Sequence, residues 1–411
     1  MSASGRCGRL PDTEVPSFGP FRSAESLLCR WFMHWPRLSI ESVRPSRFLP
    51  PFCPWPECVA HRVLGRGFQR NGWYRKPSDI RRIPRFRCRD CWRSCSRQTF
   101  STTYYLKRPA LLTAVAAGLV AGSAHRQIAR SQLCSKTSVT RMAERLGRHA
   151  ILFHARCRKA LPSLTETLVH DHFEAFIGRQ DRALALGTAV GSRSWFVYDV
   201  DPAPHRGSGR RPDRKPEATA PSPANRSYIR SIQRTFRGLI PHLSEGQPLV
   251  VNVDGRKDYG MAVRAPDLAS RVVLQIYPNP RRGPKGTPRS PEAKNRDRAM
   301  FPVDQLHQLL RHSCADHKRE TISFGRRLES IMGRAHLLAA WKNFIKSRSE
   351  RRPDRTTPAM RLGITDTRWR WERLLSRRLF PGRECVSESA RAIYRKRWTR
   401  SLPDLALEHA A

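Results

Sequence analysis

Acidic residues are scarce in this chain of 411 residues. It contains 34 Asp and Glu against 77 Lys and Arg, which leaves a formal net charge of +43. Solubility alone requires far less charge of one sign, and a surface this basic repels cationic partners. The composition therefore predicts a protein that binds polyanions.

Long hydrophobic runs are also absent. The N-terminus lacks the apolar core of a signal peptide, and the longest apolar run, residues 110–121, is too short to span a bilayer. The eleven cysteines are an odd number, and the closest pair has the spacing of metal ligands rather than that of a disulfide framework. We expect a soluble protein in a reducing cytoplasm, without a membrane partner.

The chain has no internal repeat, and its length predicts two or three domains. Hydrophobic residues make up 39%, too many for wholesale disorder, so folded modules joined by basic linkers are expected. Outside the modules described below we expect a loosely ordered basic arm at 1–50, basic linkers at 201–225 and 279–298, and an Arg/Trp-rich C-terminal extension at 351–411.

Cysteines and aromatic residues cluster between residues 51 and 106. The segment contains a C-x4-C and a C-x2-C pair, and four thiolates at this spacing can surround one tetrahedral zinc ion. The expected ligands are Cys53, Cys58, Cys88 and Cys91. Cys95 is an alternative to Cys91, and four buried free cysteines are the alternative to a zinc site. The stretch between the pairs would form the two β-hairpins of a zinc ribbon, in which the zinc is structural.

Residues 107–160 have apolar side chains at helical spacing. Three helices are expected, at 110–121, 123–130 and 135–147. Ser135 is the expected N-cap of the third helix and Gly147 its stop, with Val139, Met142 and Leu146 on the buried face. If the second and third helices form a helix-turn-helix, the side chains available to a DNA major groove are Lys136, Thr140, Arg141 and Arg145. The alternative is a three-helix bundle with a solvated basic face.

From residue 165 to 350 the pattern changes to an α/β order. Strands are expected at 167–176, 182–190, 195–200, 248–253 and 271–277, with a helix at 228–240 and a long helical region at 303–346. The expected fold class is multidomain α+β: a zinc ribbon and a helix-turn-helix, followed by an α/β domain of the ribonuclease-H-like type with a mixed five-stranded sheet.

Three carboxylates stand isolated in this basic chain. Asp171 lies in the expected first strand, Asp254 ends the expected fourth strand, and Glu320 lies in the expected helical region. In a ribonuclease-H-like sheet the first and fourth strands are neighbours, so the two aspartates can reach one metal, and a helix packed on the sheet can supply a third ligand. Carboxylate oxygens suit Mg²⁺ or Mn²⁺. Two such ions can promote in-line phosphodiester cleavage and strand transfer.

Each acid also has a purely structural explanation. Asp254 precedes a glycine, as in many turns after a strand, and Glu320 can pair with neighbouring Arg and Lys residues. Glu329 is the rival third acid: on one unbroken helix it would lie about half a turn round from Glu320, so only one of the two could face the metal. Glu174 is the rival to Asp171.

The span from about residue 53 to 394 resembles the DDE transposases of bacterial insertion sequences, which carry the same three modules in this order. The stretches that carry the resemblance are 86–103, 122–147, 169–176, 248–259 and 317–343. It implies Asp171, Asp254 and Glu320 as the catalytic triad, Mg²⁺ as cofactor, and recognition of terminal inverted repeats. Basic residues near the site would neutralise DNA phosphates, among them Arg256, Lys257 and Arg319. We expect a homo-oligomer on paired DNA ends, in the cytoplasm and associated with the nucleoid.

Three other functions fit parts of the sequence. A DNA-binding regulator derived from a transposase would use only the ribbon and the helix-turn-helix. A metal-dependent nuclease would use the triad without strand transfer. A basic RNA- or ribosome-binding protein would have no use for the α/β module.

Overall fold

The computed structural model describes residues 48–64, 66–76, 79–161, 163–205, 226–280, 284, 286–318, 321–350 and 354–396. All of these residues belong to one compact unit, Leu38–Ala411. The predicted arm up to residue 47 and the tail beyond 396 lie outside them. None of the described helices combines the length and the apolarity that a membrane crossing requires.

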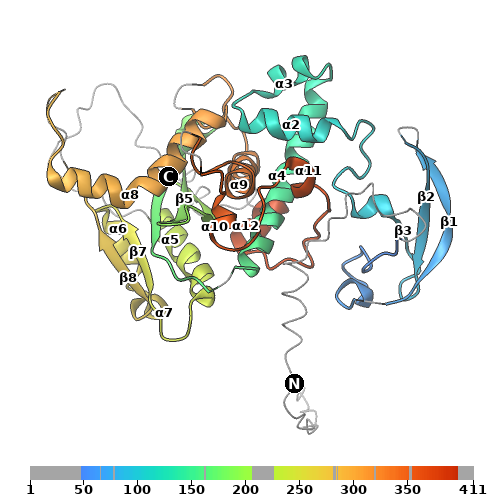
Figure 1. The fold of residues 1–411 in the computed structure, drawn as a ribbon, viewed down its shortest axis with the longest axis horizontal. Coiled ribbons are helices and arrows are strands. Elements are labelled where there is room, and N and C mark those ends of the chain that lie inside the picture. The colour runs from blue at the N-terminus through green and yellow to red at the C-terminus, as the bar shows by residue number, and fades with distance from the viewer. Residues whose placement is uncertain are drawn as a thin grey trace, which may run out of the picture. The chain divides into compact units, whose positions relative to one another are not determined.

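A small antiparallel sheet of three strands, drawn in blue in Figure 1, follows the first cysteine pair. Its strands are β1 (Phe68–Lys76), β2 (Asp79–Cys88) and β3 (Ser94–Ser96), flanked by the short 3₁₀ helices η2 (Val59–His61) and η3 (Arg97–Phe100). Phe86 and Ile83 of β2 are buried, whereas the basic side chains Arg82 and Arg85 are exposed. β1 and β2 form one hairpin between the two cysteine pairs, whereas β3 pairs with β2 from beyond the second pair, so only one of the two hairpins predicted for the stretch between the pairs lies there.

Three helices follow: α2 (Leu111–Val120), α3 (His125–Ser131) and α4 (Lys136–Lys159). The Ser135 hydroxyl accepts a hydrogen bond from the Ser138 backbone N–H at 3.2 Å, so the predicted N-cap is confirmed. The three predicted core positions of α4 are buried, Val139, Met142 and Leu146.

The predicted stop at Gly147 is wrong, because α4 continues to Lys159. Gly147 instead lies where α4 crosses α9 (Leu328–Phe344). A Cβ atom on Gly147 would lie 2.9 Å from the Cα atom of Gly333, which is closer than atoms can approach. The glycine therefore serves close helix packing rather than helix termination.

The larger sheet has five strands in the order β6-β5-β4-β7-β8. They are β4 (Leu168–Ile177), β5 (Arg179–Gly191), β6 (Val197–Pro204), β7 (Leu249–Val253) and β8 (Val272–Ile276). β4, β5 and β6 pair antiparallel, whereas β4, β7 and β8 pair parallel. The mixed five-stranded sheet and the adjacency of its first and fourth strands agree with the sequence prediction. β7 is a nearly continuous apolar run because it lies between two neighbours with both faces covered.

Two elements precede β7 in the chain: α5 (Arg226–Leu239) and the 3₁₀ turn η4 (Ile240–His242). Two short helices follow it: α6 (Lys257–Ala262) and α7 (Pro266–Ala269). Helix α8 (Pro291–Ser313) follows β8 and packs on β4, β5 and β7 (Figure 1). The predicted linker at 279–298 is therefore wrong in its second half. Ser290 caps α8 by accepting from the Ala293 N–H at 3.2 Å, and Pro291 occupies the first helical position. This Ser-Pro start signal is present in the sequence.

Two further predicted boundaries need correction. β6 extends to Pro204, so the linker predicted at 201–225 begins later, and residues 206–225 lie outside the described part. The long helical region predicted at 303–346 is two helices, α8 and α9, joined by a segment that is not helical where it is described. The Thr321 hydroxyl donates to the Ala315 carbonyl and accepts from the Ser323 N–H, both at 2.9 Å, and this local turn competes with a helix.

The described part of the C-terminal extension contains α10 (Pro358–Arg361), α11 (Trp371–Leu374) and α12 (Glu388–Tyr394). Trp369 is buried, with its ring centroid 4.7 Å from that of Phe344 in α9 and 5.8 Å from that of Phe153 in α4. Phe380 packs against Phe100 at 5.7 Å. This segment is thus part of the core that joins the small sheet and the helices.

We predict that Gly147→Ala lowers the free energy of unfolding by about 1–3 kcal/mol, because the added methyl group overpacks the α4–α9 crossing. Gly260→Ala in α6 is the control, since no atom lies within 4 Å of the new Cβ and alanine favours the helix. Chemical denaturation of both variants tests the prediction. Equal stability of Gly147→Ala and wild type would contradict the close crossing.

Candidate metal centres

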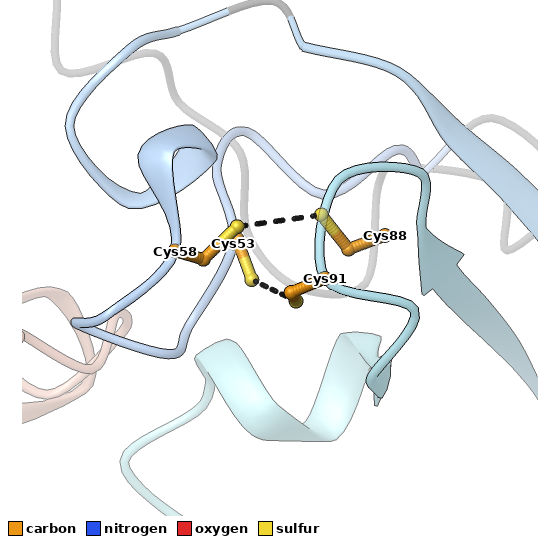
Figure 2. Close-up of side chains that lie close together, drawn as sticks. All are labelled: Cys53, Cys58, Cys88 and Cys91. Atoms are coloured by element: carbon orange, nitrogen blue, oxygen red, sulfur yellow. Dashed lines mark hydrogen bonds between the residues drawn. The ribbon is translucent and has the colours of Figure 1, made fainter.

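Four cysteines converge at one end of the small sheet. Cys53 and Cys58 come from the loop around η2, and Cys88 and Cys91 from the turn after β2 (Figure 2). The Sγ atoms of Cys53 and Cys91 are 3.6 Å apart, those of Cys58 and Cys88 are 3.8 Å apart, and all four lie within 4.8 Å of one another. Thiolates on one tetrahedral zinc ion lie about 3.8 Å apart. The cluster therefore has the size and the ligand set of a zinc site.

The backbone shapes this cluster. The Cys53 N–H donates to the Ala60 carbonyl at 2.9 Å, which closes the first loop, and Trp92 adopts a positive φ of 60°, which turns the chain after the second pair. Burial raises the pKa of Cys53. Burial also raises the pKa of Cys91, but hydrogen bonding with the Arg93 backbone and the other thiols outweighs it and leaves this pKa below its usual value. A bound zinc ion would stabilise the thiolate form of these cysteines.

Cys95, the alternative ligand, does not belong to this cluster. It lies in β3 opposite Phe86, and burial raises its pKa to about 12. Cys91 instead completes the set of four.

We predict that Cys91→Ser and Cys88→Ser lose the bound zinc, whereas Cys95→Ser retains it. Zinc content after gel filtration, together with thermal unfolding, measures both effects. Loss of a structural zinc removes much of the stability of a module this small, so the small sheet should unfold in the first two variants. Zinc retention by all three variants would contradict the assigned ligand set.

The second candidate centre lies where β4 and β7 run side by side. Their last registered pair is Val169 with Asn252, and Asp171 and Asp254 each lie two residues beyond it. Side chains two residues apart on a strand point to the same face. The Asn252 amide on this face donates to the Ala299 carbonyl of α8 at 3.4 Å. Both carboxylates are thus directed to the side of the sheet that α8 covers.

Burial strongly perturbs these two acids. Burial, with the neighbouring Asp254 acting in the same direction, raises the pKa of Asp171 to about 7. Burial also raises the pKa of Asp254, against the opposing effect of Arg256. Two carboxylates that disfavour ionisation in this way fit a divalent cation, which would neutralise both.

Helix α8 presents two groups to Asp171 that the sequence reasoning missed. The first is His307, whose Nδ1 atom lies 3.7 Å from Asp171 Oδ2 and whose Nε2 atom lies 2.9 Å from the Thr188 hydroxyl. The second is Asp304, one turn earlier, which pairs with Arg296 and contributes to the raised pKa of Asp171. Both residues lie in the helical region predicted at 303–346, but nothing in the sequence shows that this helix packs against β4.

Of the two candidates for the third acid of the predicted triad, only Glu329 lies within the described residues. Glu320 and its neighbour Arg319 lie outside the described residues. The prediction of one unbroken helix through Glu320 and Glu329 is wrong, because α9 begins at Leu328 and residues 321–327 are not helical. Glu329 Oε1 lies 4.0 Å from Arg327, and its Oε2 is buried with no hydrogen bond among the described residues. α9 packs mainly on α4 and also contacts β6, the edge strand of the sheet.

Glu174, the rival to Asp171, lies on the opposite face of β4. It accepts a hydrogen bond from the Tyr228 hydroxyl of α5, and its other oxygen lies 3.5 Å from His205. On this same face the Tyr259 hydroxyl of α6 donates to the carbonyl of His170 at 3.0 Å. That bond ties the segment after Asp254 to the residue before Asp171, and so holds the aspartate pair in place.

The residues expected to contact DNA differ in their environment. Lys136 and Arg141 of α4 and Lys257 of α6 are exposed. Thr140 is half-buried and bonded to His125 Nδ1 at 3.0 Å, and Arg145 donates to the Thr102 carbonyl at 2.8 Å. These last two side chains are engaged within the protein.

Arg256 sits beside the aspartate pair. Its Nε donates to Asp258 at 3.0 Å, and its guanidinium lies 4.1 Å from the ring centroid of Tyr228. It is partly exposed, so it remains able to meet a phosphate.

A third group of ligand-type side chains, Cys314, Asp316 and His317, is buried after α8. Asp316 Oδ1 accepts from His317 Nδ1 at 3.0 Å and from Arg334 at 3.3 Å. Burial raises the pKa of Asp316, but Arg334 and His317 outweigh it and hold the pKa at about 2. The charge of this carboxylate is already balanced, so the group anchors the inter-helix segment to α9.

The chain has been compared with known proteins, and neither a protein-family model nor a curated protein matches it.

We predict that Asp171→Asn stabilises the metal-free protein above about pH 7. The folded-state pKa of Asp171, about 7, exceeds the unfolded value, so wild type loses stability as pH rises from about 4 to about 7. Removal of the charge avoids this loss, which is at most about 4 kcal/mol. Asp267→Asn is the control: hydrogen bonding to Arg237 lowers the pKa of this exposed acid, so its loss should not stabilise.

Thermal unfolding at pH 5 and pH 8, with and without Mg²⁺, measures these differences. Mg²⁺ should raise the melting temperature of wild type at pH 8 and leave that of Asp171→Asn unchanged. A Mg²⁺ shift of equal size in both proteins would place the cation elsewhere.

Proposed function

We propose that this protein is a DNA transposase of the DDE type, which binds the ends of its insertion sequence and performs metal-dependent DNA cleavage and strand transfer. One observation carries the proposal. Asp171 in β4 and Asp254 directly after β7 occupy matching positions on adjacent parallel chain segments, and burial raises the pKa of both, in a chain of net charge +43. An acidic pair that is largely shielded from solvent in so basic a protein suits a metal ion held against a phosphate.

The strand order supports a ribonuclease-H-like assignment for the larger sheet, because its first and fourth strands are neighbours. The cysteine cluster and three-stranded sheet support a zinc ribbon, and α3 and α4 support a helix-turn-helix. Within it, Lys136 and Arg141 at the exposed start of α4 would meet the major groove. The order of these modules is that of the transposases which the sequence resembles.

In the proposed mechanism Asp171 and Asp254 hold the metal, and Glu320 completes the triad. When bound, Mg²⁺ or Mn²⁺ supplies electrostatic stabilisation of the charge that develops on the phosphate and the leaving oxygen. Arg256 and Lys257, two and three residues after Asp254, would bind the phosphates on either side of the scissile bond. The Tyr259–His170 hydrogen bond keeps the two aspartates at a fixed separation.

Paired ends require at least a dimer, so we propose a homo-oligomer on DNA. A metal-dependent nuclease would use the same carboxylates, and a DNA-binding regulator would use neither of them. Only a transposase joins a cut end to target DNA, so this reaction distinguishes it from the nuclease and from the regulator.

We predict Mg²⁺-dependent cleavage and joining of DNA that carries the element's own flanking ends. Asp254→Asn should bind this DNA as wild type does and lose at least about 100-fold in cleavage rate, because the metal loses a carboxylate. Asp267→Asn, an exposed acid paired with Arg237, should cleave normally. Cleavage without joining would identify a nuclease, and binding without cleavage by wild type a regulator.

We predict that Glu320→Gln loses cleavage whereas Glu329→Gln retains it, because Glu329 lies on α9, which packs on α4 and on the edge strand β6. Both variants should bind DNA with wild-type affinity in gel-shift assays. The reverse result would make Glu329 the third acid.

A further inference from the structure

Lys342 is a buried cation in the last turn of α9. The residue is 4% exposed, and its Nζ atom donates a hydrogen bond to the Trp195 carbonyl at 2.6 Å. A carbonyl oxygen satisfies one N–H of the ammonium group but does not neutralise its charge. Burial of a charge without an opposite charge is unfavourable. A negatively charged group beside Lys342 would therefore be stabilising.

The pocket beside Lys342 is lined by cations. Lys346 and Arg348 line it together with Lys342, and none of the described residues that line it is acidic. The Arg348 guanidinium lies 3.9 Å from the ring centroid of Trp195, and that ring packs against Phe301 of α8 at 5.2 Å. Trp195, in the turn between β5 and β6, thus positions Lys342 through its carbonyl and Arg348 through its ring.

The acid closest in sequence to these cations does not balance Lys342. Glu350 forms an ion pair with Lys346, but its side chain is 76% exposed and is not among those that line the pocket. Burial, together with repulsion from Lys346 and Arg348, lowers the pKa of Lys342 to about 7. The cluster therefore has an excess of positive charge that a bound anion would relieve.

The size of the pocket limits which anion fits. Its volume is about 10 Å³, which is room for about one water molecule. A whole phosphate ion is too large to enter, but one oxygen atom of a phosphate group fits, with the rest of the group at the mouth. Lysine and arginine side chains both bind phosphate oxygens through charge-assisted hydrogen bonds.

We propose that Lys342, Lys346 and Arg348 bind a phosphate group at this pocket, and that in the complex with DNA it belongs to the DNA backbone. The assignment to DNA rests on the proposed function, whereas the phosphate site itself does not. A free phosphate ion has the same chemistry, so the experiment has to separate the two sources. The site adds a DNA contact at the C-terminal end of α9 to those proposed at α4 and α6.

The first arm of the test measures how tightly the full-length protein binds a random-sequence DNA duplex at several salt concentrations. It is done at pH 6, below the pKa of Lys342. Lys342→Met should weaken binding about threefold or more, and should reduce the slope of log affinity against log salt by about 0.9, the value for one phosphate contact. Lys294→Met removes an equal charge from an exposed position on α8, and should leave the slope unchanged.

The second arm uses inorganic phosphate without DNA. Phosphate should raise the melting temperature of wild type and of Lys294→Met above the value in chloride of equal ionic strength, and this rise should be smaller in Lys342→Met. A phosphate effect that depends on Lys342, with unchanged DNA affinity and salt slope, would overturn the assignment to DNA. Equal behaviour of Lys342→Met and wild type in both arms would overturn the site.

A third measurement needs no variant, so it decides the matter even if Lys342→Met does not fold. Tungstate is a tetrahedral analogue of phosphate that scatters X-rays anomalously. Crystals of the full-length wild type soaked in tungstate should show an anomalous peak at the mouth of the pocket, and ordered Lys342 and Arg348 side chains without a peak would overturn the site. Failure of the proposed function is distinct, because it would appear as a loss of cleavage with the effect of Lys342 on DNA affinity intact.

Discussion

The parallel pairing of β4 with β7 is the contact on which the candidate site depends. It brings together two aspartates that are 83 positions apart in the sequence and places them at the same level of one sheet. Burial then disfavours the charge on both, so the fold stores an unfavourable electrostatic interaction that a cation would relieve. A site of this kind costs stability when empty and gains it when filled.

Other parts of the structure hold this pairing in place. The Tyr259 hydroxyl links α6 to β4 beside Asp171, and α8 closes the face of the sheet to which the aspartates point. α9 contacts β6 and α8 and crosses α4 closely enough to require glycine at both Gly147 and Gly333. The helices that precede the sheet are thereby connected to it through packing, and Trp369 of the C-terminal segment fills the same core.

The features predictable from sequence were those with a local signal. Alternating and apolar runs predicted all five strands, cysteine spacing predicted the cluster of four, and Ser135 predicted the start of α4. The errors came where tertiary contacts determine whether a helix ends or begins. Gly147 was predicted to end a helix, but the structure shows that it allows close packing against Gly333. The basic Pro-rich stretch was predicted to be a linker, but Ser290 caps α8 and Pro291 is its first residue. His307 could not be found, because its partner Thr188 is 119 positions away.

The most direct test of the central claim is anomalous X-ray scattering from crystals of the full-length protein soaked in Mn²⁺. The account predicts a strong anomalous peak between the carboxylates of Asp171 and Asp254, and its absence from crystals of Asp254→Asn. Ordered aspartate side chains without a peak between them, at saturating Mn²⁺, would contradict the metal centre and with it the proposed chemistry.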